Sequence, residues 1–74
     1  MTPKQESVYY IVKRYGKISG ISAMDIGTSA GYQRKKAEKW AKPALKELVK
    51  LKLVRREGEK YYPTEVAYYL MELL

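Results

Sequence analysis

The chain of 74 residues contains no cysteine and no histidine. Without cysteine it can form neither disulfides nor thiolate metal sites. Without histidine it lacks the commonest general base and the commonest nitrogen ligand for metals. The sequence also has no glycine-rich phosphate loop and no clustered carboxylates. We therefore predict a protein that is not an enzyme and that has no metal site and no cofactor.

Acidic residues are scarce relative to basic ones. Eight Asp and Glu stand against 15 Lys and Arg, which gives a net charge of +7 and a pI near 9.7. Such a balance favours an acidic partner, either nucleic acid or an anionic membrane surface. The longest apolar run, VAYYLMELL, is too short to cross a bilayer, and the polar first residues are unlike a signal peptide. We expect a cytoplasmic protein with no membrane partner and no evident small-molecule ligand.

The length and the hydrophobic content of 46% predict one small globular domain over residues 1–74. Asparagine is absent, while Lys and Glu are abundant. Depletion of thermolabile amides together with enrichment in Lys and Glu is typical of thermophilic proteins.

The segment 33–52 (QRKKAEKWAKPALKELVKLK) is the most informative part of the chain. Wound as a helix, it separates into a basic face and an apolar face. The basic face covers roughly 80° of the helix surface and consists of Lys35, Lys39, Lys42, Lys46 and Lys50. The apolar face consists of Ala37, Ala41, Ala44, Leu45, Leu48 and Leu51. Like charges at these spacings repel one another. Either the face is simply solvated, or a bound polyanion such as DNA relieves the repulsion.

Two starting points are open for this helix. It begins near Gln33, or it begins at Pro43 and leaves 33–42 as a separate helical turn. We favour the earlier start, because Gly31 marks a stop and Gln, Arg and Lys are good helix formers. Pro43 would then lie inside the helix and should kink it.

Residues 53–64 (LVRREGEKYYPT) predict a β-hairpin. Two runs rich in β-branched and aromatic residues flank a turn at 57–59 that contains glycine. Tyr61 and Tyr62 alternate across the second strand, so one should be buried and the other exposed. The basic residues on or beside the hairpin tip are Arg55, Arg56 and Lys60.

A basic amphipathic helix followed directly by a basic hairpin is the arrangement of the recognition helix and wing in winged helix-turn-helix proteins. The runs PALKEL (43–48) and LVRRE (53–57) resemble the corresponding parts of PadR- and MarR-type regulators. One departure is Lys52, where those families usually have glycine at the helix C-cap. In size and layout the chain also resembles small regulators of archaeal viruses and plasmids. The resemblance implies an α+β, mostly α, fold: a three-helix core, a short strand, a hairpin wing and a C-terminal helix.

The first third of the chain supplies the other core elements. Thr2-Pro3-Lys4-Gln5 is a capping-box start for a helix that runs to about Tyr15, with Gly16 as a left-handed C-cap. The predicted buried residues of this helix are Val8, Ile11, Val12 and Tyr15. The short segment 17–21 is expected to form a strand that pairs with the wing.

In that strand, Ile18 and Ile21 should point inward. Ser22 then caps a second helix over 23–30, with Asp25 at its N3 position, and Gly31 ends it. Met24 and Ile26 are the expected core contacts of this helix.

The resemblance and the charge pattern together predict a DNA-binding transcriptional regulator. Helix 33–52 would enter the major groove, and the wing, 53–64, would meet the backbone or the minor groove. The predicted DNA-binding residues are Tyr32, Gln33, Arg34, Lys35, Lys36, Lys39, Lys42, Lys46, Arg55, Arg56 and Lys60. Gln33 either reads adenine or is merely solvated, and Trp40 is either an edge packer or a base-stacking platform. The alternative functions are binding to structured RNA and mediation of protein contacts.

The last segment, 65–74 (EVAYYLMELL), predicts a helix opened by Thr64 as its N-cap. Its apolar residues form one stripe and a second, wider face, more than a small monomer can bury. We expect a homodimer on double-stranded DNA, with Tyr68, Met71 and Leu74 at the interface. The alternative is a monomer whose last helix folds back on the first.

Overall fold

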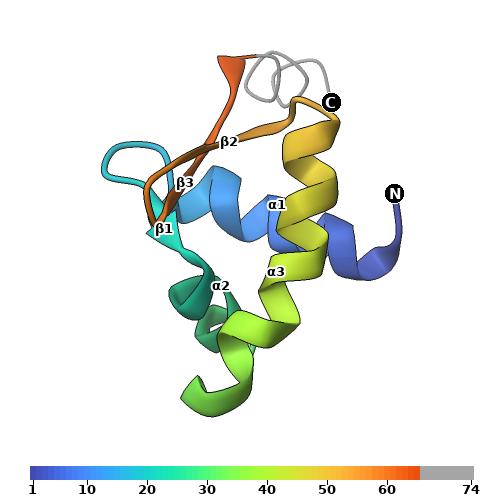
Figure 1. Cartoon of the computed structure of the whole chain (residues 1–74), viewed down its shortest axis with the longest axis vertical. Helices are drawn as coiled ribbons and strands as arrows, with labels where there is room; N and C mark the ends of the chain where they lie inside the picture. The colour runs from blue at the N-terminus through green and yellow to red at the C-terminus, as the bar shows by residue number, and fades with distance from the viewer. Residues whose placement is uncertain (66–74) are drawn as a thin grey trace.

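The structure is a computed structural model, and it describes residues 1–65 (Figure 1). All but the first residue of the expected helix over 65–74, including the expected interface residues Tyr68, Met71 and Leu74, lies outside the described residues. The elements are α1 (Pro3–Tyr15), β1 (Ile21–Ser22), α2 (Ala23–Ser29), α3 (Arg34–Lys50), β2 (Val54–Glu57) and β3 (Lys60–Pro63). This mostly helical α+β architecture confirms the predicted fold class at that level and is compatible with a winged-helix layout.

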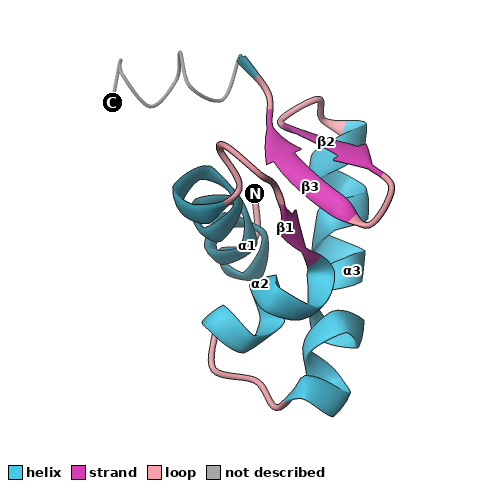
Figure 2. Ribbon diagram, turned by 90° about the vertical axis from the view of Figure 1, so that its left-hand side faces the viewer, coloured by secondary structure: helices cyan, strands magenta, loops and turns pink. Residues whose placement is uncertain are grey.

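The three strands form one antiparallel sheet in the order β1-β3-β2. The hairpin predicted at 53–64 is present, with Val54 opposite Pro63 and Glu57 opposite Lys60. A short strand pairs with the wing as predicted, but it comprises Ile21–Ser22 and not 17–21; Ile21 pairs with Tyr61 of β3. Figure 2 shows the sheet at one end of the molecule, beside the C-terminal half of α3, with α2 at the opposite end. The central strand β3 therefore pairs with β1, which leads into α2, and with β2, which follows α3.

The core lies where α1, α2 and α3 meet the inner side of the sheet. Its largest fully buried side chains are Val8, Val12, Ile26, Leu45, Leu48 and Val54. Of the two adjacent tyrosines, Tyr61 is buried as predicted, whereas Tyr62, expected to be exposed, is half-buried. Every helix and every strand thus contributes residues to one core cluster, and only the tip of the hairpin lies outside it among these elements.

The crossing of α2 and α3 depends on a glycine. A Cβ atom built on Gly27 would lie 2.3 Å from the carbonyl oxygen of Ala37 and 2.4 Å from its Cα atom. Both neighbours are backbone atoms, which cannot move aside as a flexible side chain can. The small residues Gly27 and Ala37 therefore set how closely α3 rests on α2.

Local hydrogen bonds start the first two helices as predicted. Thr2 Oγ1 accepts from the Gln5 backbone N–H at 3.2 Å, and Gln5 Oε1 accepts from the Thr2 N–H at 3.2 Å. This is a complete capping box, with Pro3 at the first helical position. Ser22 Oγ likewise accepts from the Asp25 N–H at 3.1 Å, which caps α2.

The two helices α2 and α3 end in the same backbone arrangement, a Schellman motif. At the end of α3 the Lys52 N–H donates to the Val49 carbonyl and the Leu53 N–H donates to the Leu48 carbonyl, both at 3.0 Å. At the end of α2, Gly31 occupies the equivalent position with φ of 98°. Lys52 has φ of 65° and is the one non-glycine residue of the described range with positive φ.

Helix α3 is one continuous helix that contains Pro43, so the alternative start at Pro43 is wrong. The helix begins at Arg34, with Gln33 as its N-cap, and ends at Lys50. These bounds lie within the predicted 33–52. Leu51, placed on the apolar face by periodicity, is 54% exposed, because it follows the last turn and the chain then turns into the hairpin.

Three predictions for the end of α1 and the loop that follows it are wrong. Tyr15 is 56% exposed and accepts a hydrogen bond from Arg14 Nε, while Tyr9 is buried in the core instead. Ile18 is 95% exposed, because it lies in the loop before the strand begins. Gly16 has φ of −96° and is not left-handed. Glycine is needed there because a Cβ would lie within 3 Å of two backbone carbonyl oxygens.

Candidate nucleic-acid interface

Helix α3 exposes the whole predicted lysine face. Its five members, Lys35, Lys39, Lys42, Lys46 and Lys50, are all exposed. The first turn contains no acidic residue, and the N-cap Gln33 makes no side-chain hydrogen bond within the described structure. Backbone N–H groups at a helix start carry partial positive charge and attract anions. The N-terminal half of α3 is therefore positive from both its side chains and its backbone.

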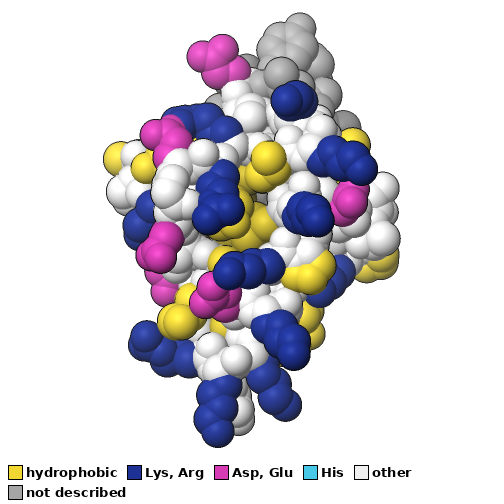
Figure 3. Space-filling model, in the orientation of Figure 1, with side chains coloured by type: hydrophobic (Ala, Val, Ile, Leu, Met, Phe, Trp, Pro, Cys, Tyr) yellow, Lys and Arg dark blue, Asp and Glu magenta, His cyan; other side chains and the backbone are white. Residues whose placement is uncertain are grey.

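A groove runs between α3 and the hairpin. Lys42 and Lys46 of α3 and Arg56 of β2 line it, so cations reach it from two different elements. Its other lining residues are Leu45, Val49 and Tyr61. Figure 3 shows Lys and Arg side chains around a hollow with hydrophobic side chains at its floor. The fold thus brings together cationic residues of the two predicted DNA-binding segments.

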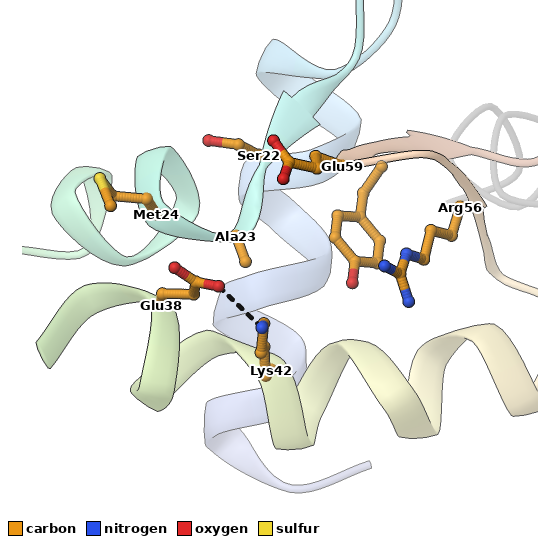
Figure 4. A pocket seen from close by; sticks show the side chains of 8 residues that line it. Ser22, Ala23, Met24, Glu38, Lys42, Arg56 and Glu59 are labelled. Atoms are coloured by element: carbon orange, nitrogen blue, oxygen red, sulfur yellow. Dashed lines mark ion pairs between the residues drawn. The ribbon is translucent and has the colours of Figure 1, made fainter.

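The groove continues into a second hollow towards the start of α2. Ser22 lines it from the end of β1, Met24 from α2, Glu38 and Lys42 from α3, and Glu59 from the hairpin turn (Figure 4). Lys42 Nζ lies 2.7 Å from Glu38 Oε1. The hydrogen bond and the charge of Glu38 raise the pKa of Lys42 above its usual value. Lys42 is therefore cationic throughout the physiological pH range.

The two hairpin arginines differ in their surroundings. Arg56 Nε donates to the Gly58 carbonyl at 2.8 Å, which holds the side chain near the turn and leaves its terminal nitrogens towards the groove. Arg55 lies over the ring of Tyr62, 4.4 Å from the centroid, and forms an ion pair with Glu57. Arg56 thus lines the groove, whereas the Arg55 guanidinium packs on the hairpin itself.

The predicted site residues around the start of α3 do not all lie on one side. Tyr32 stacks on Trp40, with ring centroids 4.5 Å apart, and Lys4 Nζ lies 5.2 Å from the Trp40 centroid. Trp40 also packs against the core, so the edge-packing interpretation is confirmed. At about 100° per residue, Lys36 lies about 160° round the helix from Glu38 and so points away from the hairpin.

The sequence analysis did not predict several residues that line the groove and the second hollow, among them Ser22 of β1, Met24 of α2, Glu38 of α3 and Glu59 of the hairpin turn. Only Glu38 has a local signal, since it precedes Lys42 by four residues, the spacing of a helical ion pair. The other three reach the groove through the tertiary packing of α2 and the hairpin against α3, which no local pattern reveals.

Comparisons with protein-family models, with curated proteins and with solved structures find no match for this chain. Among the helices of the described range, none combines the length and the apolar character needed to cross a membrane. The functional argument therefore depends on the sequence pattern and on the geometry of the groove.

Proposed function

We propose that this chain is a winged helix-turn-helix protein that binds double-stranded DNA and regulates transcription in the cytoplasm. Helix α3 is the recognition helix and enters the major groove, which is wide enough to admit an α-helix. The hairpin β2–β3 is the wing and meets the adjacent backbone or minor groove.

One observation carries the proposal: cations of α3 and of the hairpin line the same groove. Lys42 and Lys46 face Arg56 across it. Lys35 and Lys39 continue the lysine face towards the start of α3, and Lys50 lies at the end of the helix. A solvated lysine-rich face would need no such convergence, because mutual repulsion favours spreading the charges apart. A sugar-phosphate backbone between the two elements relieves that repulsion and releases counterions.

Lysines dominate this surface, and lysine acts as a point charge rather than as a planar fork. We therefore expect direct base reading to be modest and binding to random duplex at low salt to be clear. DNA shape and deformability would add to the discrimination between sequences.

The proposal is tested by titrating the protein with a duplex, a single strand and a structured RNA over a series of salt concentrations. The duplex should bind most tightly. The substitutions Lys39→Ala and Arg56→Ala should each make the negative slope of log K against log [salt] shallower by about 1, because each removes one phosphate contact. Lys13→Ala, which removes the same charge from α1, is the control and should leave the slope unchanged. Tighter binding of the structured RNA, or unchanged slopes in both test variants, would contradict the proposal.

The proposal includes a homodimer, which would place two recognition helices about one turn of DNA apart. The chain is near the size at which one core is only marginally stabilising, so added interface would also support folding. Sedimentation at micromolar concentration should give the mass of two chains. A monomer mass that is unaffected by Met71→Glu would count against the dimer and leave the DNA-binding proposal standing.

A further inference from the structure

An aromatic pair lies near the start of α3, on the flank away from the hairpin groove. Trp40 lies about 160° round the helix from Lys42. Tyr32 stacks on Trp40, with ring centroids 4.5 Å apart. Trp40 is half-buried against the core, whereas Tyr32 is 42% exposed. Tyr32 therefore covers part of Trp40 and itself remains in contact with water.

The position of Tyr32 is fixed by the fold. Its backbone N–H donates to the Gly27 carbonyl at 3.1 Å, as part of the turn that ends α2. The close packing of Gly27 on Ala37 holds that turn against α3. Contacts with α2 and with Trp40 thus order the side chain in the free protein, so a ligand that stacks on its ring would cost little additional conformational entropy.

Cations from two elements flank the aromatic pair. Lys4 of α1 has its Nζ atom 5.2 Å from the Trp40 centroid. Lys36 precedes Trp40 by about one helical turn and lies about 40° from it round α3. The two glutamates of α3 lie elsewhere, since Glu38 lines the hollow beside the hairpin and Glu47 follows Trp40 by about 10 Å along the helix axis. The immediate surroundings of the pair are therefore positive.

An exposed aromatic ring beside cations suits a nucleobase that has left its base pair. Nucleobases stack on aromatic side chains through their flat faces, while lysines contact the adjoining phosphates. In a fully paired duplex the neighbouring bases cover both faces of each base, so only an unpaired base can use such a ring. An apolar protein partner would fit poorly, because it would have to desolvate Lys4 and Lys36.

The place of the pair on α3 would bring it to a DNA strand. The major groove is about 12 Å wide, and a helix with its side chains is about 10–12 Å across. A helix that occupies the groove therefore meets one strand on each flank. The flank with Lys42 and Arg56 would take one strand, and the flank with Tyr32 and Trp40 would face the other.

We infer that Tyr32, supported by Trp40, stacks on an unpaired base within a DNA duplex, with Lys4 and Lys36 on the adjoining phosphates. This inference rests on the proposed DNA-binding function. It goes further because it names the structural class of DNA that the protein prefers, a duplex with an unpaired nucleotide. Tyr32, Lys4 and Lys36, which lie outside the hairpin groove, thereby form a second contact with the same DNA.

The test compares three duplexes of one sequence with the full chain. One is fully paired, one has a single unpaired adenine inserted in one strand, and one has an abasic nucleotide at the same place. Wild type should bind the duplex with the unpaired adenine about tenfold more tightly than the paired duplex, the gain expected from one stacked base. The abasic duplex has the same extra phosphate without the base, so it should show no gain.

Variants assign the gain to the ring. Tyr32→Phe keeps the ring and should keep the gain, whereas Tyr32→Leu keeps an apolar cover on Trp40 and should lose it. Tyr10→Leu makes the same change at an exposed tyrosine of α1 and is the matched control. The readout is the ratio of the two affinities for each variant, so a general change in DNA binding cancels. In addition, 2-aminopurine at the unpaired position should lose fluorescence when it stacks on the ring of wild type, and not with Tyr32→Leu.

Each contrary result separates this inference from the function on which it rests. If wild type binds the paired duplex and the duplex with the unpaired adenine equally, the inference is wrong and the proposed function stands. The same holds if the abasic duplex gives an equal gain, or if Tyr32→Leu retains the gain. If wild type binds no duplex at low salt, both are wrong.

Discussion

The left-handed residue that ends α3 offers the sharpest stability test. Lys52 occupies the C′ position of a Schellman motif with φ of 65°. An L-residue in this conformation costs roughly 1–2 kcal/mol, because its Cβ approaches the following carbonyl oxygen. Glycine has no Cβ and avoids the cost. The substitution Lys52→Gly should therefore stabilise the fold.

The expected magnitude is smaller than the full conformational cost. Glycine is also freer in the unfolded chain, which returns about 0.4–1 kcal/mol. The net gain in unfolding free energy should be about 0.5–1 kcal/mol. With an unfolding entropy of about 2.1 cal/mol/K per residue, a chain of this length should melt roughly 3–6 °C higher. The Thr64 hydroxyl, which donates to the Lys52 carbonyl at 2.8 Å, keeps its acceptor in the variant.

Thermal and urea unfolding followed by circular dichroism measure this gain. Lys52→Ala is the control, because it removes the charge and the long side chain but keeps the Cβ atom. Gly31→Ala makes the reverse change at the end of α2, where φ is 98° and no atom lies within 4 Å of an added Cβ. It should cost about 1 kcal/mol from the backbone alone. A Lys52→Gly variant no more stable than Lys52→Ala would refute the assignment of strain to Lys52.

Three further changes test the packing. Gly27→Ala should destabilise the fold by about 2 kcal/mol or more in urea unfolding, since its Cβ would overlap the Ala37 backbone; Ser29→Ala, on the exposed side of α2, should change stability by less than about 0.5 kcal/mol. Ser22→Ala should cost about 1 kcal/mol through loss of the α2 cap, and a shift below about 0.3 kcal/mol would count against that cap. The buried Tyr9 hydroxyl has no hydrogen-bond partner in the described structure, and burial raises its pKa. Tyr9→Phe should thus melt at the same temperature as wild type or higher, and a clear loss would show that the hydroxyl is paired.

Local chemistry determined the starts of α1 and α2 and the turn of the hairpin. Thr2 and Ser22 cap the helices that follow them, and Gly58, with φ of 61°, lies in the predicted turn. The 3.6-residue period of 33–52 also predicted which face of α3 is buried. These features depend on residues within one or two turns of each other, so the sequence alone is sufficient to reveal them.

Which apolar residues are covered depended on the tertiary structure. Periodicity placed Tyr15 and Leu51 on buried faces, yet both lie at helix ends beyond the reach of the packed core. Periodicity describes the direction of a side chain round a helix and does not say how far a neighbouring element extends along it. Tyr9 is buried because the neighbouring elements cover α1 over a wider arc than its apolar stripe.

The groove also required the tertiary structure. The sequence identified the cations of α3 and of the hairpin separately, but the packing of β2 beside α3 places Arg56 opposite Lys42 and Lys46. The same packing separates the two glutamates of α3 and leaves Glu38 beside the hairpin. Charge pattern along the chain thus suggested the kind of partner that we propose. The long-range pairing of β1 and β3 and the close approach of α2 to α3 decided which charges meet, because those contacts join residues far apart in the sequence.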